Sequence, residues 1–142
     1  MEIVAISAAI IVILIAVGVL AVFLLFNEKE QPKRGLWYVE LWNICHGYVV
    51  QLQFSGHMIV GRTSLLYYAS GPVPAEPDIT VSSEHCMIFD QGGTLLVHNM
   101  SAVNPAVLNG RRLDFPTQFK PGDRLEMGKS VFLITRVVSE EP

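Results

Sequence analysis

Residues 95–128 decide the fold, and they read LLVHNMSAVNPAVLNGRRLDFPTQFKPGDRLEMG. Short apolar runs alternate here with turn signals. The runs are Leu95–Val97, Ala106–Leu108 and Leu125–Met127. Asn109-Gly110 is a strong hairpin signal, because both central residues of that turn need a positive φ. Pro121-Gly122-Asp123 marks a second turn. Many short strands at such close spacing predict a β-sandwich or a barrel.

The same β pattern continues on both sides of this stretch. From Tyr48 to Phe54 every second residue is apolar, which is the period of a strand with one buried face. The segment from Trp37 to Leu41 is rich in aromatic and β-branched residues, which favour strands. Further apolar runs are Met58–Val60, Met87–Phe89 and Val131–Val138. We therefore expect an all-β domain with no helix after Phe26.

One stretch between these strands is harder to assign. Residues Ala69 to Pro77 include a glycine and three prolines, and they predict an irregular loop. The sequence leaves open whether Leu65–Tyr68 is a strand before this loop, or Asp78–Val81 a strand after it.

The N-terminus carries a different signal. Residues Ile3 to Phe26 form a run of 24 residues in which only Ser7 and Gly18 interrupt the apolar side chains, and the run contains no charge. A helix of that length spans about 36 Å, enough for a hydrocarbon core of about 30 Å. A cleaved signal peptide is the first alternative, but the run is too long, lacks a basic start and ends without a small-residue cleavage site. A buried core helix is the second, and apolar residues on every face argue against it.

The residues after this run predict its orientation and the domain boundaries. Lys29, Lys33 and Arg34 follow the span and no basic side chain precedes it, so the positive-inside rule places the C-terminal side in the cytoplasm. We expect the layout to be a transmembrane anchor (1–26), a polar linker (27–35), a folded domain (36–138) and a C-terminal tail (139–142).

Charge and cysteine content exclude several classes of protein. The net charge is −3, and after Phe26 ten basic residues face twelve acidic ones, without the basic stripe of a nucleic-acid binder. The two cysteines, Cys45 and Cys86, are too few for a disulfide scaffold, and we expect both to be free, buried thiols.

Four short motifs appear in a fixed order along the predicted domain. They are Gly61-Arg62 after an apolar strand, Ser82-Ser83-Glu84-His85 before another strand, the Asn99–Gly110 segment, and Phe119–Gly128 with its Pro-Gly-Asp turn. Each motif is weak alone, but the ordered set resembles the forkhead-associated (FHA) domain family over about Trp37 to Val138. The resemblance implies a β-sandwich of roughly eleven strands whose loops at one end bind phosphothreonine peptides.

The resemblance also implies roles for individual residues. Arg62 would contact the phosphate, since a planar guanidinium fork fits phosphate oxygens. Ser82 would support the phosphate, and Asn104 would hold the main chain of the ligand. Ser83 and Val103 occupy the neighbouring contact positions. Four residues would support the site structurally: Gly61 by allowing a close approach, His85 by bracing the loops, and Asn109 and Gly110 by forming a hairpin turn.

Several positions depart from the family pattern. Ser83 stands where a stronger donor is frequent, and Val103 replaces a hydroxyl residue. Ala102 and Pro105 replace a serine and a glycine. Acidic Glu76, Asp78 and Glu84 lie among the expected contacts, with Arg62 as the one clear cation. Since a hydrogen bond to a charged group is worth about 1.5–3 kcal/mol, these changes predict weakened phosphate binding or its replacement by another contact.

Enzymatic and metal-binding functions find little support in the sequence. There is no Gly-rich phosphate loop with lysine, no G-x-S-x-G and no H-E-x-x-H motif. Cys45-His46 and His85-Cys86 offer zinc-type ligands, but adjacent ligands lack the usual spacing and point to opposite faces of a strand. We expect no catalytic residue, metal, cofactor or small-molecule substrate.

These observations predict a single-pass cell-membrane protein with an FHA module in the cytoplasm. Its expected partner is a phosphorylated protein, a substrate of a Ser/Thr kinase, and nucleic acid is not expected as a ligand. The layout resembles small bacterial membrane-anchored FHA proteins that act in signalling or in envelope and cell-division assembly. The alternative is a phosphate-independent scaffold of a membrane complex.

Overall fold

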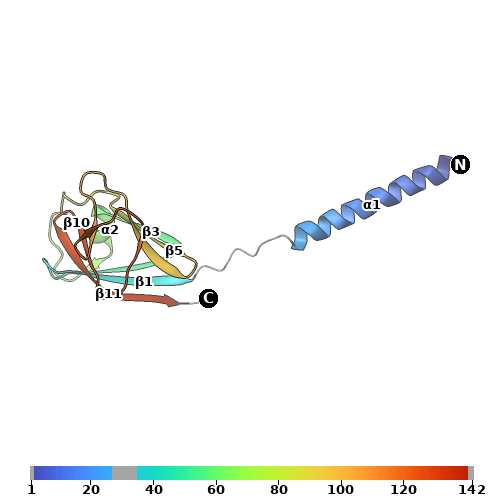
Figure 1. The fold of residues 1–142 in the computed structure, drawn as a ribbon. Coiled ribbons are helices and arrows are strands. Elements are labelled where there is room, and N and C mark those ends of the chain that lie inside the picture. Colours follow the sequence, from blue (N-terminus) through green and yellow to red (C-terminus); the bar gives the residue numbers. More distant parts are fainter. Residues whose placement is uncertain (1, 27–34, 141–142) are drawn as a thin grey trace. The chain divides into compact units, whose positions relative to one another are not determined.

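The computed structural model describes residues 2–26 and 35–140, which fall into an N-terminal helix and a separate compact β unit (Figure 1). The elements are α1 (Glu2–Phe26), β1 (Leu36–Asn43), β2 (Val49–Ser55), β3 (His57–Val60), α2 (Arg62–Tyr67), β4 (Ala69–Ser70), β5 (Cys86–Gln91), β6 (Thr94–Asn99), β7 (Val107–Leu108), β8 (Arg111–Arg112), β9 (Thr117–Gln118), β10 (Arg124–Met127) and β11 (Ser130–Glu140).

Helix α1 has 25 residues and is long and apolar enough to cross a membrane, by length and composition alone. A signal sequence near an N-terminus satisfies the same criterion. Residues 27–34, which hold most of the predicted linker and its three basic residues, lie outside the described residues.

The β unit is a sandwich of two antiparallel sheets, which confirms the predicted fold class. A seven-stranded sheet has the order β4-β2-β1-β11-β10-β7-β8, and a four-stranded sheet has the order β3-β5-β6-β9. Burial alternates along β1 and β2, as the period-two pattern predicts. The inward side chains of the two sheets form one core, whose largest fully buried members include Leu41, Leu52, Ile88, Phe132 and Ile134. Burial of each such side chain contributes about 1.5–3 kcal/mol.

The predicted Asn-Gly turn is confirmed. Asn109 and Gly110 have φ of 51° and 80°, and Leu108 pairs with Arg111 across them. This two-residue loop joins β7 and β8, strands of only two residues each. Strands as short as β8 and β9 carry no periodic signal, so the sequence did not indicate them.

The expectation of no helix after Phe26 is wrong. Helix α2 begins directly after β3 because the Ser64 hydroxyl accepts a hydrogen bond from the Gly61 N–H at 2.8 Å, and Leu65 buries its side chain in the core. Leu65–Tyr68 is therefore not a strand, and Asp78–Val81 forms a turn. Within the predicted loop, only Ala69–Ser70 forms a strand, by pairing with β2.

The C-terminal end of the sheet is longer than predicted. Ser139 and Glu140, expected in the tail, belong to β11, because they pair with Trp37 and Leu36 of β1. Residues 141–142 lie outside the described residues.

Candidate functional site

Hydrogen bonds connect the three segments that contain the predicted contact residues. The backbone N–H of Arg62, at the start of α2, donates to the carbonyl of Ser82 at 3.0 Å. From the segment between β6 and β7, the Asn104 side chain (Nδ2) donates to the carbonyl of Thr80 at 3.0 Å. The segment between β4 and β5, which contains Thr80 and Ser82, therefore lies between the other two.

Gly61 lies where the start of α2 approaches the segment between β4 and β5. A Cβ at this position would overlap the carbonyl oxygen of Ser83, and it would stand 2.5 Å from the carbonyl carbon of Ser83 and 2.8 Å from the carbonyl oxygen of Ser82. The backbones can therefore be this close only if residue 61 has no side chain.

The Arg62 side chain lies along the backbone of residues 79–81. Its Nε donates to the carbonyl of Val81 at 2.8 Å and its Nη2 to the carbonyl of Ile79 at 3.3 Å. A guanidinium has five N–H donors, so three remain for a ligand. The half-buried side chain also lines a pocket of about 300 Å³. Lys129, in the turn between β10 and β11, lines the same pocket and adds a second cation that sequence reasoning missed.

Ser82 and Asn104 belong to a network centred on Ser101. The hydroxyls of Ser82 and Ser101 share a hydrogen bond of 2.7 Å, and the Asn104 N–H donates to the Ser101 hydroxyl at 3.2 Å. Ser101 is buried, and the Asn99 side chain supports it by accepting the Ser101 N–H and donating to the Ser101 carbonyl. These two residues lie within the Asn99–Gly110 motif, but the sequence did not single them out as site residues.

The structure does not bring every predicted contact residue into this network. Arg62 faces the 300 Å³ pocket, whereas neither Ser82 nor Asn104 lines it. Ser83 is exposed, and Val103 is 84% exposed, with no polar group on its side chain to offer a ligand. Three predicted residues (Arg62, Ser82 and Asn104) are therefore joined through backbone and side-chain bonds, and two are not.

Glu76 and Asp78 line the same pocket as Arg62. Hydrogen bonds engage both carboxylate oxygens of Asp78. Its Oδ1 accepts the N–H and the hydroxyl of Thr80, and its Oδ2 accepts the Ser130 hydroxyl at 2.7 Å. Burial opposes ionisation of Asp78, but the hydrogen bonds from Thr80 and Ser130 outweigh it and hold the pKa below its ordinary value. Among the acids that we expect near the site, Glu76 and Glu84 remain exposed.

His85 braces the segment that follows Thr80. The side chain is fully buried, and its Nδ1 accepts the Ser82 N–H at 3.0 Å. Burial lowers the pKa of His85, and the Asn104 backbone and the Asp78 charge oppose that shift only in part. The ring is therefore neutral near pH 7, with the proton on Nε2, a buried atom that makes no hydrogen bond of normal geometry to any described residue.

Because His85 is buried, we expect the free energy of unfolding to fall on mild acidification. The pKa of His85 in the folded protein lies below its ordinary value of 6.5, so the unfolded chain binds more protons as the pH drops through that value. The stabilisation that the neutral His85 ring gives the fold is complete above pH 6.5. It is lost as the pH falls toward the folded pKa, because a proton on Nδ1 removes the hydrogen bond from the Ser82 N–H. Thermal melts of the full chain between pH 7.5 and 5 measure this slope.

His57, which is exposed on β3, provides the matched control. We expect His85→Gln to flatten the slope between pH 7.5 and 5, and His57→Gln to leave it unchanged. Equal slopes in wild type and His85→Gln contradict the assignment. A further decline near pH 4 and below belongs to Asp78, whose folded pKa lies under 3.8.

The two cysteines differ in environment. Both are free, as predicted, but the expected burial is wrong for Cys45, which is exposed because it lies in the turn between β1 and β2. Cys86 is buried, and burial raises its pKa to about 12. In the part of the chain that the structure describes, no three His, Cys, Asp or Glu side chains are grouped to hold a metal ion.

Comparisons with known proteins agree with the fold. A family model described as "FHA domain" matches residues 58–128, half of the chain. The solved structure "Structural and functional analysis of phosphothreonine-dependent FHA domain interactions" is 25% identical, with a TM-score of 0.52, and covers 70% of this chain and 96% of its own. No match was found among curated proteins.

Two further structures are similar in fold. The FHA domain of CT664 from Chlamydia trachomatis is 14% identical, with a TM-score of 0.51, over 71% of this chain and 97% of that one. EmbR of Mycobacterium tuberculosis, in complex with a low-affinity phosphopeptide, is 18% identical, with a TM-score of 0.53. The match to EmbR covers 75% of this chain but 26% of EmbR.

Proposed function

This chain belongs to the FHA domain family, and from that membership we propose that it is a binding module, not an enzyme, that recognises phosphothreonine-containing segments of partner proteins. The observation that carries the proposal is the placement of Arg62. Its guanidinium lines an open pocket with three N–H donors unused, next to the loop that bears Ser82.

The remaining groups supply complementary contacts. Lys129 lines the same pocket and adds positive charge. Among the described residues, the Ser82 hydroxyl interacts with Ser101 alone, and the Asn104 side-chain amide keeps its oxygen and one N–H available. A bound phosphate would accept hydrogen bonds from the Arg62 N–H groups that do not donate to Val81 and Ile79, and hydrogen bonds to a charged acceptor are stronger than those to neutral carbonyls.

A second function, phosphate-independent scaffolding, has its own supporting observation. Val103 and Ile79, in two loops that the Asn104–Thr80 bond joins, are 84% and 80% exposed. Apolar side chains this exposed favour direct contact with a partner's apolar surface, and Ser83 and Val103 supply no charged donor. In that function Arg62 serves only to hold the loop that contains Ile79 and Val81, through its hydrogen bonds to their carbonyls.

Paired peptides separate the two functions. The full chain in neutral detergent is titrated with a phosphothreonine peptide library and with the same sequences unmodified. The phosphate-reading function predicts a higher affinity for the phosphorylated set, which declines with salt. Equal affinities for both sets favour the scaffold.

We also propose that α1 anchors the module in the cell membrane with the β unit in the cytoplasm, in signalling or in envelope and cell-division assembly. The length and apolar composition of α1 support the anchor. Lys29, Lys33 and Arg34 in the sequence after it support the orientation.

Cys45 gives a direct test of this topology. We expect a membrane-impermeant maleimide to label the chain only after cells are permeabilised, and then once per molecule, because Cys86 is buried with a pKa of about 12. Mass spectrometry counts the labels. Cys45→Ser should remove the label and Cys86→Ser should keep it. Labelling of intact cells at Cys45 contradicts the orientation, and loss of α1 from the mature chain contradicts the anchor.

A further inference from the structure

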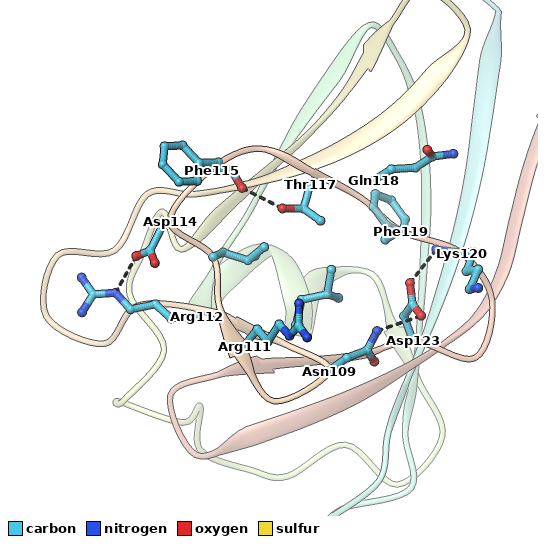
Figure 2. Close-up of a pocket in the computed structure, with 12 residues that line it drawn as sticks. Asn109, Arg111, Arg112, Asp114, Phe115, Thr117, Gln118, Phe119, Lys120 and Asp123 are labelled. Carbon is cyan, nitrogen blue, oxygen red and sulfur yellow. Dashed lines mark hydrogen bonds and ion pairs between the residues drawn. The ribbon is translucent and has the colours of Figure 1, made fainter.

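A second and larger hollow, of about 830 Å³, lies between the open edges of the two sheets (Figure 2). Among the described strands, β8 is the last strand of one sheet and β9 the last strand of the other. Residues of both strands line the hollow. On β8 the Arg112 carbonyl already accepts the Asp114 N–H, whereas no described strand pairs with the outer side of β9, where N–H and C=O groups can pair with an added strand. We call this hollow the β8–β9 groove.

Positive charge points into this groove. Arg111 pairs with Leu108, whose side chain is buried, and paired residues of antiparallel strands project from the same face. Arg111 is exposed, and this pairing directs it toward the hollow that it lines. Lys120 lines the other end of the groove, and neither cation forms an ion pair with a described residue.

The acids of the groove are already engaged. Asp114 pairs with Arg112 at 3.2 Å, and Figure 2 shows this pair at one end. Asp123 is buried and accepts hydrogen bonds from the Asn109 side chain and from the Lys120 N–H. Two cations, Arg111 and Lys120, thus remain without a carboxylate partner, although the chain as a whole has a net charge of −3.

The groove also has apolar surface. Leu113 and Phe119 line it and are buried, and Phe115, on the loop between β8 and β9, is 78% exposed. An exposed phenylalanine beside unpaired cations suits a ligand that carries both negative charges and an apolar side chain.

We propose that the β8–β9 groove binds an extended acidic segment of a partner protein, independently of phosphorylation. The acidic side chains pair with Arg111 and Lys120, the backbone pairs with a free strand edge, and an apolar side chain packs on Phe115. The strand edge favours an extended polypeptide over a membrane surface, because only a polypeptide has the regularly spaced N–H and C=O groups that pair with such an edge.

The test uses the full chain in neutral detergent and three sets of unphosphorylated heptapeptides, in which acidic, neutral or basic residues alternate with apolar ones. We expect the acidic set to bind best, and Arg111→Glu to weaken that binding about tenfold or more. Arg136→Glu is the matched control, since Arg136 is exposed on β11, outside the groove. Amide exchange should slow in residues 111–118 when the acidic peptide binds.

Three results overturn the proposal. The first is equal binding of the acidic and neutral sets. The second is an equal effect of Arg111→Glu and Arg136→Glu on acidic-peptide affinity, measured in variants whose melting temperatures match that of wild type. The third is protection of residues 111–118 by nanodiscs of anionic lipid but not by the acidic peptides, which identifies a membrane-facing surface. If Arg111→Glu does not fold, Lys120→Glu replaces it, because the Lys120 side chain is exposed.

Discussion

Gly61→Ala should destabilise the β unit by about 3 kcal/mol, close to the largest cost of overpacking a closely packed site. The added methyl group would overlap the carbonyl of Ser83, a backbone atom that cannot move aside as a side chain can. The backbone of Gly61 is itself held, since its N–H donates to Ser64 and its carbonyl accepts the Leu65 N–H. Thermal melts of the full chain should show a loss of about 15 °C.

Gly92→Ala is the matched control for this substitution. Gly92 has φ of +62°, but a Cβ there meets nothing within 4 Å. This variant therefore bears only the conformational cost of the left-handed region, about 1–2 kcal/mol. A Gly61→Ala variant no less stable than Gly92→Ala contradicts the close approach of the two segments. We also expect any binding through Arg62 to fall with the first variant and to persist in the second.

Much of the fold is predictable because it depends on local signals. Alternation along Tyr48–Phe54 requires one buried face, and Asn109-Gly110 requires a turn with two positive φ angles. The Gly61-Arg62 and Ser82–His85 motifs lie side by side, since the Arg62 N–H donates to the Ser82 carbonyl.

The missed elements have physical reasons. Helix α2 has six residues, too few for a helical period to show, and tertiary contacts through Leu65 support it. Lys129 is 67 positions from Arg62 in the sequence, yet the turn between β10 and β11 brings both to one pocket. That turn is fixed by Gly128, where a Cβ would overlap Thr80, and by the bond from the Lys129 N–H to the Thr80 hydroxyl.

The structure also changes the charge balance that the sequence suggests. From the sequence alone, Asp78 is expected to repel an anionic ligand. In the structure its oxygens accept three hydrogen bonds from Thr80 and Ser130. A carboxylate so engaged presents fewer lone pairs to solvent. Arg62 and Lys129 line the pocket together with two acids, Glu76 and Asp78, of which Asp78 is already hydrogen-bonded. The sequence alone suggests one cation among three acids, so the pocket is more favourable to phosphate than the sequence indicates.

Arg62→Ala should lower the affinity for phosphothreonine peptides by about 10- to 100-fold, because hydrogen bonds to a charged group are worth about 1.5–3 kcal/mol. Arg62→Lys should lose less affinity, since it keeps the charge but not the planar fork.

Arg62 also donates hydrogen bonds to the carbonyls of Val81 and Ile79, so its loss can loosen the loop. The decisive quantity is therefore the ratio of affinities for phosphorylated and unmodified peptides, measured by isothermal titration calorimetry. A looser loop lowers both affinities together and leaves their ratio unchanged. Loss of a phosphate contact lowers only the affinity for phosphorylated peptides, and therefore lowers the ratio. Arg136→Ala is the control for the loss of one positive charge. If Arg62→Ala leaves the ratio as high as in wild type, Arg62 only supports its loop and phosphate is recognised elsewhere.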